Sequence, residues 1–130
     1  MIKYTDSLQK YSPEDLEGFF VGWPNPPSQQ KHYKILQNSY CYFLAIDSST
    51  KDIIGFINAI SDGILSAYIP LLEVLPAYQN RGVATKLVHL LTHKLENFYM
   101  LDVICDKNLE SFYEKNGFIK QSGMVIRNYD

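Results

Sequence analysis

The sequence lacks the features that mark several whole classes of protein. No apolar run approaches the ~20 residues that cross a bilayer, and the first ten residues carry no apolar signal-peptide core. Twelve Lys and Arg against 14 Asp and Glu leave a formal charge of −2, so no basic surface for phosphate backbones is expected. Internal repeats and low-complexity segments are also missing. We therefore expect a cytoplasmic protein with no membrane segment and no nucleic-acid partner.

Cysteine is scarce, and histidine is not arranged for metal binding. Cys41 and Cys105 lie inside apolar runs, without a CxxC pattern and without a histidine at ligand spacing. Free cysteine packs like a small hydrophobic residue, so we expect both to be reduced core residues. His89 and His93 are four residues apart, but they fall opposite the apolar stripe of a predicted helix, which favours a solvent-facing role. We expect no metal.

The sequence does contain enough apolar residues for one core. Of the 130 residues, 46% are hydrophobic and 20% are charged, as in a typical globular domain. A chain of this length buries roughly two thirds of the surface that its unfolded form exposes. We therefore expect a single domain over residues 1–130 that needs no disulfide.

Apolar spacing, prolines and capping residues divide the chain into elements. They predict, in order, a first strand near the start, a helix beginning at Pro13, a loop over 22–28, a helix over 28–38, strands over 40–47, 53–61 and 65–74, a helix over 82–97, a strand over 100–105, a helix over 108–116 and final strands over 118–128. Pro70 cannot donate to a strand ladder, so the third of the middle strands should be bulged or splayed near residues 70–75. This order predicts a mixed sheet with helices on it, an α/β or α+β fold.

The most informative segment is residues 72–84. A strand leads through Pro76 into a polar turn, and the turn opens directly into the strongest predicted helix. Free N–H groups of the first helical turn, together with the helix dipole, form an anion site suited to a pyrophosphate. Gly82 and Ala84 would allow close approach, and Arg81 could add a charged contact. The alternative is that Gly82 only permits tight packing at the start of the helix. The glycine patterns of P-loop proteins and of dinucleotide-binding proteins do not occur in the sequence.

Two motifs resemble those of the GNAT superfamily of acyl-CoA-dependent N-acyltransferases. Residues 79–84, QNRGVA, resemble the signature Q/R-x-x-G-x-G/A, with a V-x-P at residues 74–76. Residues 108–118 resemble the family stretch N-x-x-x-x-F-Y-x-x-x-G-F. The resemblance spans nearly the whole chain and is weakest before residue 40. It implies a mostly antiparallel sheet that splays between its fourth and fifth strands, flanked by about four helices.

The resemblance also implies an activity, the transfer of an acetyl group from acetyl-CoA to a primary amine by direct attack in a ternary complex. The residues that it assigns to acetyl-CoA are Val74, Leu75, Gln79, Asn80, Arg81, Gly82, Val83, Ala84, Thr85 and Asn108. In this arrangement the pantetheine arm lies beside the strand that carries Val74, and the N–H of Val74 or Leu75 points at the thioester carbonyl. One such oxyanion donor is worth about 3 kcal/mol in the transition state.

Two residues are candidates for proton transfer. Glu73 is an acid in an otherwise apolar run, where it could take a proton from a protonated amine, or could only orient the ammonium group or make a structural hydrogen bond. By resemblance, Tyr113 is the acid that protonates the leaving thiolate. Periodicity alone favours a core tyrosine, because Leu109 and Phe112 share its face.

The acceptor side is less constrained by the sequence. By resemblance, the loop over 22–28 borders the acceptor pocket, which makes Phe19, Phe20, Trp23 and Tyr33 candidate substrate-binding residues. Alternatively, these rings only pack the first two helices onto the sheet. We expect a small-molecule amine acceptor; a protein lysine or N-terminus, and an acyl-CoA-binding module without catalysis, remain alternatives. A homodimer is compatible with the resemblance, since dimers are common in the family.

Overall fold

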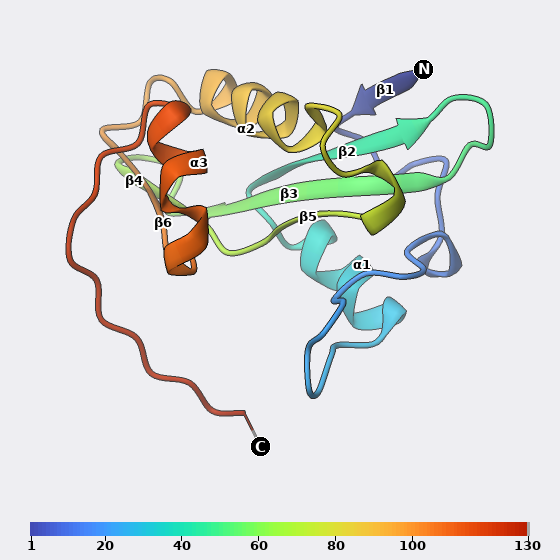
Figure 1. Cartoon of the computed structure of the whole chain (residues 1–130), viewed down its shortest axis with the longest axis horizontal. Helices are drawn as coiled ribbons and strands as arrows, with labels where there is room; N and C mark the ends of the chain where they lie inside the picture. The colour runs from blue at the N-terminus through green and yellow to red at the C-terminus, as the bar shows by residue number, and fades with distance from the viewer. Residues whose placement is uncertain (130) are drawn as a thin grey trace.

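A six-stranded mixed sheet forms the centre of the computed structural model, which describes residues 1–129 (Figure 1). The strands and α-helices are, in order, β1 (Ile2–Thr5), α1 (Gln29–Gln37), β2 (Cys41–Asp47), β3 (Ile53–Ser61), β4 (Ser66–Ile69), β5 (Leu72–Val74), α2 (Val83–Lys94), β6 (Met100–Val103) and α3 (Glu110–Lys115). The strand order is β1-β2-β3-β4-β6, with β5 paired to β3. Only β4 and β6 run parallel; the other pairs are antiparallel. The predicted mixed fold is confirmed.

Each face of the sheet has its own core. On one face, α2 packs Val83, Leu87, Val88 and Leu91 against the sheet, and Tyr113 of α3 joins the same core. On the other face, a second core combines Leu36 of α1 with buried side chains of the segment before it and of β2 and β3. Figure 1 shows α1 and α2 on opposite sides of the sheet. The N-terminal segment and α2 therefore approach β5 from opposite faces.

The sheet is broken at Pro70, as the sequence predicts. β3 pairs with β5 through Gly55–Ile57, but with β4 through Ile60 and Ser61. The buried side chain of Asn58 spans the break. Its Oδ1 accepts from the Leu71 N–H at 3.1 Å, its backbone N–H donates to the Leu71 carbonyl at 3.2 Å, and its Nδ2 donates to Ser39 Oγ at 3.0 Å. Because β4 continues alongside β6 and β5 does not, β5 keeps one unpaired edge.

The predicted helices in the middle of the chain are also confirmed. Ser28 caps α1, with its Oγ accepting from the Lys31 N–H at 3.1 Å. α2 follows Gly82, which is left-handed at φ 79°. α3 ends before Gly117, which has φ 93°. Asn108, the polar residue before the last predicted helix, does not cap α3, because it lies in a 3-10 turn over Lys107–Leu109 and Leu109 is the N-cap.

Two predicted elements are different in the structure. The expected helix at Pro13 is a single 3-10 turn, Pro13–Asp15, because Asp15 Oδ2 folds back to accept from the Ser12 N–H at 2.8 Å and closes the turn. The final strands over 118–128 are absent. This segment has suitable β-branched residues but no paired strand, and Ile119, Met124 and Ile126 are exposed. Strand propensity alone does not supply a partner edge.

The cysteines and the surface histidines lie where the sequence predicts. Cys41 and Cys105 are free, half-buried and packed against the α2 core. His89 and His93 are exposed on α2, and His93 Nδ1 lies 3.3 Å from Glu96 Oε2. Within residues 1–129, no cluster of His, Cys, Asp and Glu could hold a metal ion. None of the helices described is long and apolar enough to span a membrane.

The third histidine, His32 of α1, is buried in an aromatic cluster with both ring nitrogens unpaired. It is 1% exposed, and its ring centroid lies 4.4 Å from Phe56 and 4.8 Å from Phe20. Burial lowers the pKa of His32 from 6.5 to about 4, so the ring is neutral near pH 7.

This lowered pKa predicts pH-dependent stability. Between pH 6.5 and pH 4 the unfolded chain binds the proton and the native state does not, so stability is complete above pH 6.5 and falls as the pH drops toward 4. From pH 7.5 to pH 5, His32 should lower the free energy of unfolding by on the order of 1–2 kcal/mol. Urea denaturation of the wild type and His32→Leu at both pH values checks this. An equal loss of unfolding free energy between the two pH values in both proteins would contradict the prediction.

Candidate active site

A cavity of about 430 Å³ opens beside the unpaired edge of β5, between the start of α2 and α3. The residues that line it are Leu72, Glu73, Val74, Tyr78, Gln79, Asn80, Gly82, Val83, Ala84, Thr85, Leu109, Phe112 and Tyr113. The cavity therefore collects most of the residues that the two sequence motifs single out. Leu75, Arg81 and Asn108 are not among its lining residues.

The turn before α2 presents a row of free backbone amides to this cavity. Asn80 and Gly82 both adopt left-handed backbone conformations, with φ 64° and 79°. In the described part of the chain, no N–H group from Asn80 to Thr85 donates to a protein acceptor; the first helical bond of α2 is Lys86 N–H to Gly82 O, at 3.0 Å. Gln79 N–H is used, donating to Pro76 O at 3.3 Å. Free amides arranged in this way at a helix N-terminus can accommodate an anion.

Val74, rather than Leu75, turns its amide toward the open edge. The Leu75 N–H donates to Ile54 O at 2.8 Å, which places Leu75 at a hydrogen-bonded position of the β3–β5 pair. Bonded positions alternate in antiparallel strands, so the N–H and C=O of Val74 point away from β3. The Val74 carbonyl accordingly accepts from Gln79 Nε2 at 3.0 Å. The backbone amide of Leu75 is therefore already hydrogen-bonded inside the sheet, whereas that of Val74 faces the open edge.

Arg81 lies outside the cavity lining, over a tyrosine. Its guanidinium carbon is 5.3 Å from the ring centroid of Tyr78, whose hydroxyl donates to Asp47 Oδ2 at 2.6 Å. This hydrogen bond, with those from Ser49, holds the pKa of Asp47 well below its usual range, and the same bond raises the pKa of Tyr78. Arg81 thus takes part in a cation–π contact.

Tyr113 lines the wall of the cavity opposite β5. Its ring packs edge-on against Phe112 and Phe118, at centroid distances of 5.0 and 5.4 Å. Burial, with smaller contributions from Cys105 and Tyr68, raises the pKa of Tyr113 to about 12. The phenol is therefore protonated across the physiological range and can act as a hydrogen donor. Tyr113 is both a core residue and a cavity residue, as the two readings of the sequence required.

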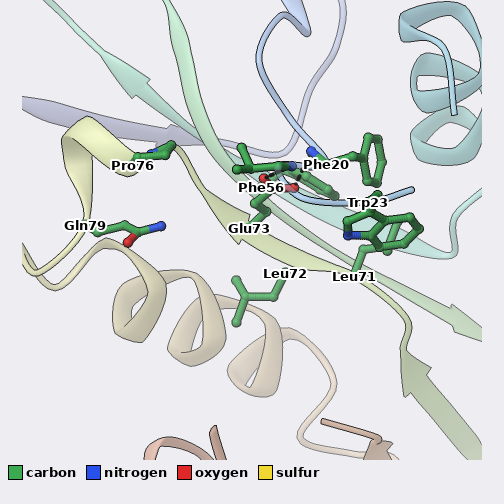
Figure 2. A pocket seen from close by; sticks show the side chains of 9 residues that line it. Phe20, Trp23, Phe56, Leu71, Leu72, Glu73, Pro76 and Gln79 are labelled. Atoms are coloured by element: carbon green, nitrogen blue, oxygen red, sulfur yellow. Dashed lines mark hydrogen bonds between the residues drawn. The ribbon is translucent and has the colours of Figure 1, made fainter. Parts of the chain in front are cut away.

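A second cavity, of about 320 Å³, lies on the other face of β5 (Figure 2). It is lined by Phe20, Val21, Trp23, Phe56, Leu71, Leu72, Glu73, Pro76 and Gln79. Three of these residues, Leu72, Glu73 and Gln79, also line the first cavity. The two cavities therefore meet along β5, where Glu73 and the open side of the strand lie together.

Glu73 holds the N-terminal loop against β5. Its Oε1 accepts from the Phe20 N–H at 2.7 Å and its Oε2 from the Val21 N–H at 3.2 Å. Phe20 is left-handed at φ 65°, between Gly18 and Gly22, which also have positive φ. Two backbone amides thus orient the carboxylate, and the carboxylate in turn holds a strained loop. Glu73 makes a structural hydrogen bond and also faces both cavities.

The aromatic candidates divide into two groups. Phe20 and Trp23 line the second cavity, with ring centroids 5.0 Å apart. Phe19 lies behind them, 5.2 Å from Phe56, and the Tyr33 hydroxyl donates to Tyr11 O at 2.9 Å, so neither lines the cavity. Phe19 and Tyr33 pack beside the cavity, and their assignment to substrate binding stays a prediction.

Several lining residues were not singled out from the sequence. Phe56 on β3 lies directly opposite Glu73 in the β3–β5 pair, and Leu71 follows the break at Pro70. The signal for Phe56 is its place in the register, which requires knowing that β5 pairs with β3. Leu109 and Phe112 shared a helix face with Tyr113 in the sequence, and that spacing could have placed them at the first cavity.

Comparison with known proteins identifies the family. A model of the acetyltransferase (GNAT) domain matches residues 7–129. The chain belongs to the GNAT acetyltransferase family. This GNAT chain is 38% identical to a candidate acetyltransferase from Deinococcus radiodurans R1, with a TM-score of 0.94 over 98% of this chain and 89% of that chain. These two matches show that the chain is an acyltransferase enzyme.

More distant structures share the GNAT fold. A GNAT family protein from Streptococcus pneumoniae TIGR4 is 24% identical, with a TM-score of 0.77 over 100% of this chain and 98% of that chain. An aminoglycoside N-acetyltransferase solved in complex with CoA is 17% identical, with a TM-score of 0.73 over 98% of this chain and 94% of that chain. No curated protein matches the chain in sequence.

The Glu73 contacts predict how the loop responds to substitution. Glu73→Ala removes both acceptors, so the Phe20 and Val21 amides should exchange with deuterium at least about tenfold faster, because each lost bond to a charged acceptor is worth more than 1 kcal/mol. Hydrogen exchange followed by NMR measures this. Glu110→Ala, which removes a surface ion pair with Lys120, is the control and should leave both amides unchanged. Equal exchange rates of the two amides in the wild type and in Glu73→Ala would disprove that Glu73 holds the loop.

Proposed function

We propose that this GNAT enzyme transfers an acetyl group from acetyl-CoA to the primary amine of a small molecule, in a ternary complex. The observation that carries the proposal is the meeting of two cavities at β5: one presents free amides for an anion, and the other presents a carboxylate among apolar side chains. The CoA complex of the aminoglycoside N-acetyltransferase, a protein of the same fold, supports CoA as the acyl carrier.

The first cavity suits the thioester substrate. The amides from Asn80 to Thr85 would hold the diphosphate, with the N-terminal end of the α2 dipole behind them. The free edge of β5 would pair with the pantetheine arm. The Val74 N–H then points at the thioester carbonyl oxygen, where negative charge develops as the amine attacks.

The residues around β5 can complete the reaction. Glu73 orients the ammonium group beside the thioester, and the ammonium passes a proton to solvent water before the nitrogen lone pair attacks the carbonyl carbon. A C–N bond forms, the C–S bond breaks, and CoA leaves with the electron pair on sulfur. Tyr113, protonated at physiological pH, donates a hydrogen bond or its proton to this thiolate. Because both Glu73 oxygens already accept backbone N–H groups, we assign Glu73 to orientation rather than to proton removal.

The size of the second cavity favours a small acceptor. Its lining is mostly aromatic and aliphatic, and it lies between the N-terminal loop and the sheet (Figure 2). A module that binds acyl-CoA without catalysis would need the free amides but neither Glu73 nor Tyr113. The kinetic test of Tyr113 below separates these two functions.

Gly82 tests the proposed anion site. Asn and Asp both tolerate the left-handed φ of 79°, and a Cβ at this position meets no atom within 4 Å, so Gly82→Asn and Gly82→Asp differ mainly in charge. By calorimetry, Gly82→Asn should bind acetyl-CoA within about tenfold of the wild type, and Gly82→Asp at least about tenfold more weakly than Gly82→Asn, since like charges repel at close range. Equal affinities would disprove the assignment.

Tyr113→Phe tests the acid. Loss of the hydroxyl should lower kcat by about 100-fold, the usual effect of a positioned acid, while the Kd for acetyl-CoA stays within about twofold. Thiol release with the fastest amine of a panel gives kcat, and calorimetry gives Kd. An unchanged kcat with normal folding would leave Tyr113 as a core residue only.

A further inference from the structure

We infer that the second cavity selects a primary amine with a single positive charge on a compact apolar or aromatic body. This inference rests on the proposed acetyl transfer and adds the class of the acceptor. It follows from the charge, the walls and the orientation of the cavity, which together favour such an amine over a polycation, an amino sugar or an anionic substrate.

The cavity offers one charged group. Among residues 1–129, Glu73 is the only acidic residue that lines it, and no lysine, arginine or histidine does. A polyamine would place its further ammonium groups against apolar walls without a carboxylate, at a large desolvation cost. A phosphorylated or carboxylated acceptor would meet Glu73 and no cation. One positive charge is therefore the best match.

Uncharged polar groups are scarce as well. Of the described residues that line the cavity, only Trp23, Glu73 and Gln79 carry polar side-chain groups. The Nε2 of Gln79 already donates to the Val74 carbonyl at 3.0 Å. The hydroxyl groups of an amino sugar would find few side-chain partners here, and an unpaired buried hydroxyl costs roughly 1–3 kcal/mol. This disfavours hydroxylated acceptors.

The walls provide aromatic surface. Phe20 and Trp23 meet at an interplanar angle of 65°, and Phe56 closes the cavity from β3 (Figure 2). Behind these rings, His32 packs against Phe20 and Phe56 and is uncharged near pH 7 because burial lowers its pKa to about 4. The cavity thus has an aromatic wall backed by an uncharged imidazole. Its 320 Å³ is near the lower end of ligand pockets, which favours a compact body.

The orientation of the acceptor follows from where Glu73 lies. Glu73 is shared with the thioester cavity, whereas Phe20 and Trp23 belong to the acceptor cavity alone. An ammonium group on Glu73 therefore points toward the proposed thioester, and the body extends toward Trp23. The nitrogen must be at the end of the molecule, as in 2-phenylethylamine.

The first arm of the test compares acceptors. Thiol release from acetyl-CoA is measured with 2-phenylethylamine, spermidine and glucosamine under the same conditions. We expect kcat/KM for 2-phenylethylamine to exceed the other two values by at least about tenfold. A value for spermidine or glucosamine equal to or above that of 2-phenylethylamine would overturn the inference. Absence of thiol release with every amine would instead count against the proposed function.

The second arm uses Trp23, the only tryptophan in the sequence, as a fluorescent reporter. Titration with 2-phenylethylamine, in the presence of CoA to prevent turnover, should change the emission in a saturable way, and spermidine should not. This readout does not depend on catalysis. No saturable change with 2-phenylethylamine would place its binding elsewhere and overturn the inference.

The third arm separates the body of the amine from its charge. Trp23→Ala should lower kcat/KM for 2-phenylethylamine about tenfold but that for propylamine less than about twofold, because only the aromatic acceptor reaches the ring. Tyr99→Ala removes an exposed aromatic ring that lines neither cavity and should change neither value. An equal loss for both amines in Trp23→Ala would show that Trp23 only supports the loop, and would overturn the proposed orientation.

Discussion

The structure depends on a point where backbone pairing stops. Pro70 ends β4, and the Asn58 side chain takes over the hydrogen bond that a continuous ladder would make with Leu71. Beyond this point the chain stays beside β3 but no longer has a neighbour on its outer side. The unpaired groups that remain would be costly in an apolar interior, and here they open onto a cavity where a substrate can pair with them. An interruption in the sheet thus becomes a binding edge.

The same strand separates two environments of different chemistry. On the α2 side are backbone amides and Tyr113, on the N-terminal side are aromatic rings, and Glu73 lines both cavities. Since successive strand residues face opposite sides, a strand of three residues, Leu72–Val74, can contribute to both cavities at once. The carboxylate is held by two backbone amides from a segment more than 50 positions away, so its position depends on tertiary packing.

Local chemistry made part of this site predictable. The free amides of residues 80–85 follow from a turn, a glycine and a helix start, and the break follows from one proline. Three outcomes needed information that a sequence pattern does not hold. The choice of Val74 over Leu75 depends on register, the separation of Phe20 from Phe19 depends on a left-handed residue, and the tail after Phe118 lacks a partner strand despite its β-branched residues. Each is decided by contacts distant in sequence, which periodicity does not specify.

The bond between Glu73 and the loop uses main-chain groups at Phe20 and Val21. Every residue except proline supplies the same N–H, so this anchor otherwise demands only tolerance of a positive φ at position 20. The side chains of this loop that line the second cavity can therefore be exchanged while the loop stays in register with β5. In evolutionary terms, the proposed recognition of an amine would be separable from the proposed catalytic geometry, and the lining could diversify among descendants without rebuilding the strand that joins the two cavities.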